Sequence, residues 1–250
     1  MSKSLSSPNG GYRWLDVWTL ACVIQLGTQR FCARHLDRKN DPCGRLFAQM
    51  AMAARSVPAN ISEGYSRRAT STETELRLYD VARASLAELA GDYRNFLLLR
   101  RELPWSESDP EERAVFATPL DKPAFAADVE RASAAHVLAQ YDKFARWLDS
   151  PDPLVAARAM LVLAARAILM LSAKIDRTHA DFLANGGFAE NLSRERIAAR
   201  AAAPAPRDAP ACPECGKPMH KRLAKRGPRA GHTFWSCPDF PKCPGTRSAD

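Results

Sequence analysis

The first 211 residues of this chain lack the signs of a β-sheet protein. Before the C-terminal tail, apolar and polar residues nowhere alternate with a period of two, and no segment repeats at a fixed period. The N-terminal stretch MSKSLSSPNGGYRW has no apolar core of a secretory signal. The most apolar stretch, AMLVLAARAILMLSA, contains Arg166 and is too short and too charged for a membrane span. We therefore expect a cytoplasmic protein without a membrane partner.

Cysteine is scarce and unevenly distributed. Three of the seven cysteines (Cys22, Cys32 and Cys43) precede the tail, where we expect them to act as small apolar side chains. The other four lie in CPECGKPMHKRLAKRGPRAGHTFWSCPDFPKC, from Cys212 to Cys243. Because thiols stay reduced in the cytosol, clustered cysteines favour a metal over disulfides.

The sequence also lacks the side-chain groupings that catalysis needs. His35, His136 and His179 are isolated, and no carboxylate cluster suited to Mg²⁺ is evident. We expect no enzymatic activity. A nucleic-acid-processing enzyme with an unrecognised site is the weaker alternative.

Helical patterning dominates what is present. Apolar residues recur at steps of three and four, which is typical of helices that pack against one another. Thr72 and Glu75 fit a capping box at the start of the third helix, and Gly64 is expected just after the end of the second. Residues 102–124 are expected to form an irregular insertion. Leu138, Tyr141, Phe144 and Leu148 form the stripe of the fourth helix. The predicted helices cover residues 12–36, 45–63, 72–101, 125–148, 154–182 and 193–203.

These patterns predict an all-α protein with a small C-terminal zinc ribbon of short β-strands. The expected segments are a disordered N-terminus (1–11), a helical bundle (12–200), a Pro/Ala-rich linker (201–211) and the ribbon (212–250).

The second and third helices carry a motif. ARSVPANISEGYSRR is followed by YDVARASLAEL, with Pro58, Asn60, Glu63, Gly64 and Arg67 at its centre. The motif resembles the bacterial four-helix bundle family first described as proteins encoded by intervening sequences in 23S ribosomal RNA genes. HADFLANGGFAENLSRERIAAR resembles a suffix segment of one branch of that family.

The resemblance implies an antiparallel four-helix bundle with extra helices and a ring-like homo-oligomer, a pentamer in known members. One branch includes the nucleic-acid-binding accessory subunit of diversity-generating retroelement reverse transcriptases. Read from the residues alone, Asn60, Glu63 and Arg67 have a structural or interface role, with Glu63 and Arg67 pairing across a turn.

The tail cysteines have the spacing of a metal site. Cys212 and Cys215 form C-x₂-C, and Cys237 and Cys243 form C-x₅-C, which suits tetrahedral Zn²⁺. Such a short unit buries too little to fold unaided, so metal would supply most of its stability. Two alternatives stay open: a ligand set that uses His220 or His232, and cysteines placed there by accident.

CPECGKPM, a basic run, GHTFW and CPDFPKC together resemble the C4 zinc ribbon at the C-terminus of bacterial type IA DNA topoisomerases. This resemblance implies that the tail binds nucleic acid, especially single strands. It does not imply topoisomerase activity.

Charge agrees with such a role. Lys and Arg number 36 against 28 Asp and Glu, a net charge of +8. The tail holds eight basic and three acidic residues, or +5, which leaves +3 for the other 211 residues. Trp235 and Phe240 are candidates for base stacking, whereas Phe234 is assigned either to stacking or to the ribbon core. The predicted nucleic-acid-binding residues are Lys217, Lys221, Arg222, Lys225, Arg226, Arg229, Trp235 and Phe240.

The sequence thus predicts a non-enzymatic, oligomeric adaptor that binds single-stranded DNA or RNA through its ribbon. A protein–protein scaffold with a purely structural ribbon is the main alternative, and a protein partner stays unidentified.

Overall fold

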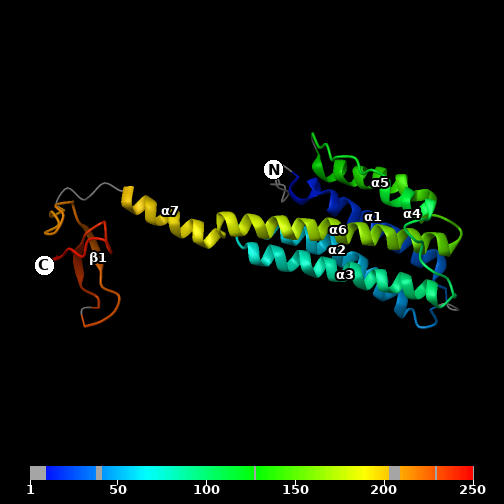
Figure 1. Cartoon of the computed structure of the whole chain (residues 1–250), viewed down its shortest axis with the longest axis horizontal. Coiled ribbons are helices and arrows are strands. Elements are labelled where there is room, and N and C mark those ends of the chain that lie inside the picture. Colours follow the sequence, from blue (N-terminus) through cyan, green and yellow to red (C-terminus); the bar gives the residue numbers. More distant parts are fainter. Residues whose placement is uncertain (1–9, 38–40, 127, 203–208, 229, 250) are drawn as a thin grey trace. The chain divides into compact units, whose positions relative to one another are not determined.

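The chain is mostly helical and ends in a small three-stranded sheet, as a computed structural model of it shows (Figure 1). The structure describes residues 10–37, 41–126, 128–202, 209–228 and 230–249. It divides into two compact units, Met1–Phe188 and Ala189–Asp250. The predicted disordered N-terminus (1–11), the centre of the predicted linker (201–211) and Arg229 fall largely or wholly outside the described residues.

The first unit begins with a 3₁₀ turn, η1 (Gly11–Trp14). Its helices are α1 (Asp16–His35), α2 (Arg45–Arg67), α3 (Thr72–Leu98), α4 (Pro110–Ala117), α5 (Val129–Leu148) and α6 (Pro153–Asn185). Helix α2 packs against α1 and α3, and α6 packs against the same two helices. Helix α5 lies on α1 and α6, and α4 contacts α6.

Large aromatic side chains fill the centre of this unit. Phe31 of α1 packs edge-on against Tyr93 and Phe96 of α3, with ring centroids 5.0 Å apart in both pairs. The buried Tyr93 hydroxyl donates to Thr28 Oγ1 at 3.1 Å, which satisfies the one polar group of that ring. These contacts join α1 to α3 through the middle of the unit.

Several helix ends differ from the sequence-based prediction. Helix α2 continues to Arg67, so Gly64 lies inside it, buried against Tyr79; a Cβ there would come within 3.0 Å of that ring. Ser71, and not Thr72, caps α3, because its hydroxyl accepts from the Thr74 N–H. Helix α4 occupies part of the expected irregular insertion and starts with Pro110, whose fixed φ suits a first turn.

The buried stripe of α5 also differs from the prediction by one residue. Leu138 is 54% exposed, whereas Val137 is buried and continues the stripe through Tyr141, Phe144 and Leu148. The last predicted helix, 193–203, begins earlier, as α7 (Phe188–Ala202). One stretch, Pro153–Ala199, is apolar and long enough to cross a membrane, with mean hydropathy 2.1 in its most apolar window. Core helices of soluble proteins pass the same test, and 44% of that window is buried here.

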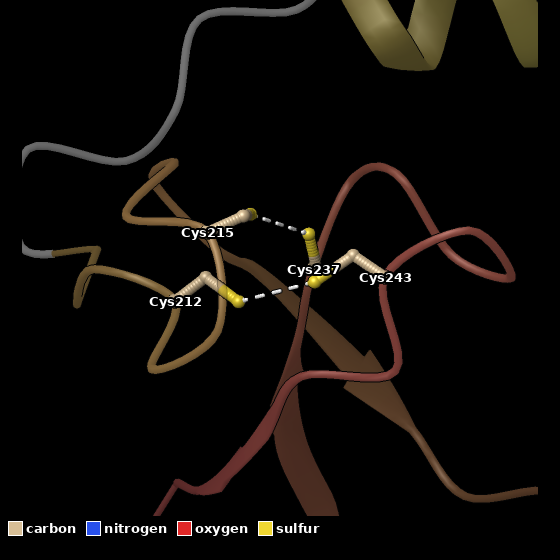
Figure 2. Close-up of side chains that lie close together, drawn as sticks. All are labelled: Cys212, Cys215, Cys237 and Cys243. Atoms are coloured by element: carbon tan, nitrogen blue, oxygen red, sulfur yellow. Dashed lines mark hydrogen bonds between the residues drawn. The ribbon is translucent and has the colours of Figure 1, made fainter.

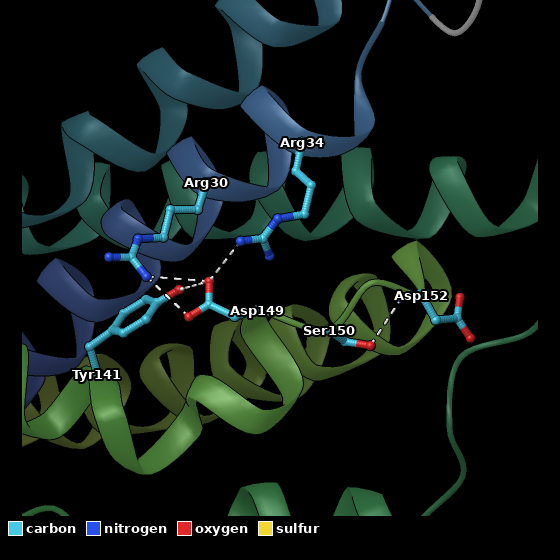
Figure 3. A network of polar contacts seen from close by, with 6 residues as sticks. All are labelled: Arg30, Arg34, Tyr141, Asp149, Ser150 and Asp152. Atoms are coloured by element: carbon cyan, nitrogen blue, oxygen red, sulfur yellow. Dashed lines mark hydrogen bonds and ion pairs between the residues drawn. The ribbon is translucent and has the colours of Figure 1, made fainter.

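A polar network fastens α5 to α1 (Figure 3). The carboxylate of Asp149, at the C-cap of α5, accepts from Arg30 at 3.0 Å and Arg34 at 3.4 Å, both on α1. It also accepts from the Tyr141 hydroxyl at 3.1 Å, and the Arg30 guanidinium lies over the Tyr141 ring. Burial and the nearby Asp149 carboxylate raise the pKa of Tyr141 to about 12, so its hydroxyl remains a donor.

Removal of this carboxylate should loosen the attachment of α5. We expect Asp149→Ala to lower the free energy of unfolding by about 1–2 kcal/mol, because a half-exposed set of charge-assisted hydrogen bonds is lost. Urea denaturation measures the change. Asp142→Ala is the matched control, since Asp142 is an exposed carboxylate of the same helix. Equal stability of the two variants would contradict this role of Asp149.

Candidate metal centre and ribbon surface

The second unit is built on a small antiparallel sheet, ordered β1 (His220–Leu223), β2 (Thr233–Ser236) and β3 (Thr246–Ser248). Two turns flank the sheet. The first turn carries Cys212 and Cys215, and the second carries Cys237 and Cys243 (Figure 2). The buried core of the unit is made of Cys212, Met219, Cys237 and Cys243, with Trp235 packed against it. The cysteines therefore stand where a larger domain would have an apolar core.

Backbone hydrogen bonds shape both turns. The Cys212 N–H donates to the Lys217 carbonyl and the Gly216 N–H donates to the Cys212 carbonyl, both at 2.9 Å. In the second turn, the Cys243 N–H donates to the Asp239 carbonyl at 3.2 Å. The Asp239 N–H also points at Cys237 Sγ, 3.4 Å away, in the manner of amides that stabilise a thiolate ligand.

The four sulfur atoms converge on one point. All lie within 4.8 Å of one another. Cys212 Sγ and Cys243 Sγ are 3.7 Å apart, and Cys215 Sγ and Cys237 Sγ are 3.5 Å apart (Figure 2). A tetrahedron with metal–sulfur bonds of about 2.3 Å has edges of about 3.8 Å, close to both distances. The geometry thus fits one tetrahedral metal ion held by the four cysteines.

The predicted four-cysteine set is the one that the structure brings together. The alternative ligands His220 and His232 are not part of the cluster, which holds only cysteines within the described part of the tail. Cys212, Cys237 and Cys243 are buried, whereas Cys215 is exposed. Of the three other cysteines, Cys32 is buried, Cys22 is half-buried and Cys43 is exposed, so the expectation of an apolar role is wrong for Cys43.

The thiols have unequal acidity. Burial opposes ionisation of Cys212, but the Glu214 and Cys215 N–H groups, together with the Cys243 and Cys215 thiols, outweigh it and lower the pKa of that thiol to about 7. Burial raises the pKa of Cys237 to about 12. Because four thiolates this close repel one another strongly, full ionisation requires a bound cation.

Gly245 has a steric role that the sequence did not reveal. A Cβ atom at this position would come within 2.3 Å of Cys212 Sγ. The Cys237 N–H donates to the Gly245 carbonyl at 3.0 Å, which holds the glycine backbone against the cluster. Only a residue without a side chain fits here, because the sulfur occupies the space that a Cβ would take.

The sheet separates the aromatic side chains onto two faces. Trp235, flanked by Lys221 and Arg247 in the strand register, packs against the cysteine core, and Lys221 Nζ lies 5.9 Å from the Trp235 ring centroid. Phe234 pairs with Arg222 and Ser248, so these three side chains share the opposite face.

A groove of about 660 Å³ lies beside Phe234, lined also by Ala224, His232, Thr233 and residues 246–248. Of the two stacking candidates, Trp235 is half-buried on the cysteine side and Phe240 is 57% exposed. Phe234 is the aromatic residue that lines the groove, although the sequence left its role open.

The predicted basic residues are distributed around the ribbon. Lys217 pairs with Asp239 at 2.5 Å and so joins the two cysteine turns. Lys225 and Arg226 are exposed in the turn between β1 and β2, Lys221 and Arg222 are exposed on β1, and Arg229 lies outside the described residues.

The motif residues of α2 lie partly in the core of the first unit and partly on its surface. Pro58 and Gly64 are buried, Asn60 is half-buried, and Glu63 pairs with Arg67 at 3.5 Å on the surface, as predicted. Glu63 belongs to no cluster of His, Cys, Asp or Glu side chains that could hold a metal in the described part of the chain. No family model, curated protein or solved structure matches this chain.

Replacement of one ligand should abolish the metal site. We expect Cys237→Ser to lose the bound metal, with loss of ordered structure in the tail, because the remaining three thiols cannot complete a tetrahedron. Metal analysis of purified protein checks this. Cys43→Ser, an exposed cysteine of the first unit, should keep one ion per chain. Full occupancy in Cys237→Ser would rule out the four-cysteine site.

A glycine substitution tests the geometry without removing a ligand. Gly245→Ala should weaken metal binding at least tenfold, because the new methyl group displaces Cys212 Sγ. Competition with a chromogenic chelator measures the affinity. Gly91→Ala is the control, since a Cβ at Gly91 meets nothing within 4 Å. Equal metal affinity in both variants would mean that the cluster tolerates the displacement.

Proposed function

We propose that this protein is a non-enzymatic, oligomeric adaptor that binds single-stranded DNA or RNA through a zinc-stabilised ribbon. The observation that carries the proposal is the four-cysteine cluster beside a sheet whose far face presents Phe234 next to Arg222. The resemblance of the tail to type IA topoisomerase ribbons supports the same reading.

Zinc is the proposed ion. Four thiolates at tetrahedral spacing form a soft ligand set, which suits Zn²⁺ better than Mg²⁺ or Ca²⁺. With four thiolates and one Zn²⁺, the tail keeps a charge near +3 from its excess of basic residues. When bound, the ion would supply structure and no chemistry, because all four of its ligands come from the protein.

The proposed contact surface is the groove beside Phe234. An unpaired base would stack on Phe234, while Arg222 across the strand and His232 in the groove would meet phosphate or base edges. Lys225 and Arg226 in the exposed turn would neutralise neighbouring phosphates. Paired bases present no free ring faces, so a stacking site of this kind favours single strands.

The first unit would act as the assembly platform. We propose that α1, α2, α3 and α6 form an antiparallel four-helix bundle of the type encoded in 23S ribosomal RNA intervening sequences. The resemblance to that family also implies assembly into a ring, a pentamer in known members of the family. Leu98, Leu99 and Leu103 support self-association, because each is at least half exposed. Several ribbons on one ring would convert weak contacts into avidity.

Binding to a fluorescent single-stranded oligonucleotide tests the ribbon surface. Phe234→Ala should weaken binding about tenfold, which corresponds to the loss of one stacked base. Leu223→Ala is the control, because Leu223 is exposed on β1 and lies on the other face. Affinity should also fall steeply with salt concentration.

Two outcomes separate this proposal from its rival. If the metal-loaded chain binds no oligonucleotide at low salt, the ribbon is structural and the protein is a protein–protein scaffold. If it binds but Phe234→Ala matches Leu223→Ala, the groove is not the contact surface.

The oligomer is tested by light scattering of the full chain. We expect a mass several times the 27.6 kDa of one chain at micromolar concentration. Leu99→Glu, which places a charge on an 81% exposed leucine, should lower that mass. A monomer at these concentrations would contradict the ring.

A further inference from the structure

A pocket in the first unit, separate from the ribbon, lies where three segments meet. Trp14, Leu15, Asp16 and Val17 line it from η1 and the start of α1, and Lys122 and Pro123 line it from the segment before α5. Helix α6 contributes Met170, Ala173, Lys174 and Arg177. The pocket measures about 410 Å³, within the range of small-molecule sites.

The pocket walls are held in place by neighbouring elements. Arg166 of α6 donates to the Thr118 carbonyl at 2.6 Å, and Gln140 of α5 bonds Asp121, so the segment that carries Lys122 is fixed from two sides. Trp14 packs against Phe125 with ring centroids 4.8 Å apart. A Cβ at Gly10 would come within 2.5 Å of Trp14 Nε1, so the glycine makes room for the indole.

Three cations line the pocket against one carboxylate. Asp16 pairs with Lys122. Lys174 Nζ pairs with Oε1 of the buried Glu75 at 3.9 Å, a distance too long for a hydrogen bond, whereas Arg177 pairs with no carboxylate among the described residues. Lys174 and Arg177 are three residues apart on α6, so their like charges repel and an anion between them would relieve the repulsion.

The remaining wall suits a flat apolar body. Trp14 is 42% exposed and lines the pocket together with Leu15, Pro123 and Met170. An indole face accepts a planar ring by stacking. Lys122, Lys174 and Arg177 outnumber the carboxylates of Asp16 and Glu75 by one. The pocket therefore joins a surface for a ring with a net positive charge.

We infer that this pocket binds a phosphate monoester attached to a planar ring, with the ring against Trp14 and the phosphate at Lys174 and Arg177. A phosphate monoester carries a charge of about −1.5 to −2 at pH 7 and three strong acceptor oxygens, so it can accept hydrogen bonds from Lys174 and Arg177 together. The same group occurs in a free nucleoside monophosphate and at the 5′ end of a nucleic-acid strand. The inference does not rest on the proposed ribbon function.

Calorimetric titration of the full chain with adenosine 5′-monophosphate tests the pocket. We expect one site per chain and about tenfold weaker binding in Arg177→Gln, because a charge-assisted contact is lost. Trp14→Leu should weaken binding as well, whereas Arg55→Gln, an exposed arginine of α2 that does not line the pocket, should leave it unchanged. Phe234→Ala in the ribbon should also leave it unchanged.

Two oligonucleotides distinguish the sources of the phosphate. If the pocket receives strand ends, a 5′-phosphorylated strand binds more tightly than its 5′-hydroxyl counterpart, and Arg177→Gln abolishes the difference. If it receives free nucleotides, adenosine 5′-monophosphate binds in an Arg177-dependent manner and the two strands bind alike. Arg177→Gln leaves the pocket walls intact, so an unchanged affinity for every probe, or no binding of adenosine 5′-monophosphate to the unmodified chain, would overturn the inference.

Discussion

Four sulfur atoms within 4.8 Å of one another form the constraint on which the second unit depends. Thiolates at that spacing repel, yet three of the four cysteines are buried and, with Met219, they make up the core of the unit. A cation bound by the four sulfur atoms would turn this repulsion into an attraction that holds the two turns together. Cys237 directly follows β2 and Gly245 directly precedes β3, so the cluster lies next to the ends of two strands.

The sheet places the aromatic side chains of β2 on two different faces. Alternation along β2 turns Trp235 toward the metal side and leaves Phe234 on the far face with Arg222 and Ser248. One aromatic residue thus supports the core while its neighbour lines the groove. The first unit is stabilised in a different way, because its helices bury apolar and aromatic side chains. The Asp149 network also attaches α5 to α1.

The sequence was informative where one residue type decides the outcome. The four ligands followed from their spacing, and most helices followed from apolar periodicity. Helix ends were harder to predict from the sequence. Gly64 was expected just after the end of α2, but it lies inside the helix, where the Tyr79 ring packs in the space that a Cβ atom of residue 64 would occupy. Tertiary packing therefore overrides local propensity here. The roles of Phe234 and Gly245 depend on strand register and on one sulfur position, neither of which a linear pattern encodes.

Zinc-dependent binding is the most direct test of the central claim that metal builds the nucleic-acid-binding surface. The full chain is stripped of metal under reducing conditions, and Zn²⁺ is then titrated back while the fluorescence anisotropy of a single-stranded oligonucleotide is followed. The account predicts that binding rises with added Zn²⁺ and saturates at one equivalent per chain. Tight binding by the stripped protein, unchanged on zinc addition, would contradict it.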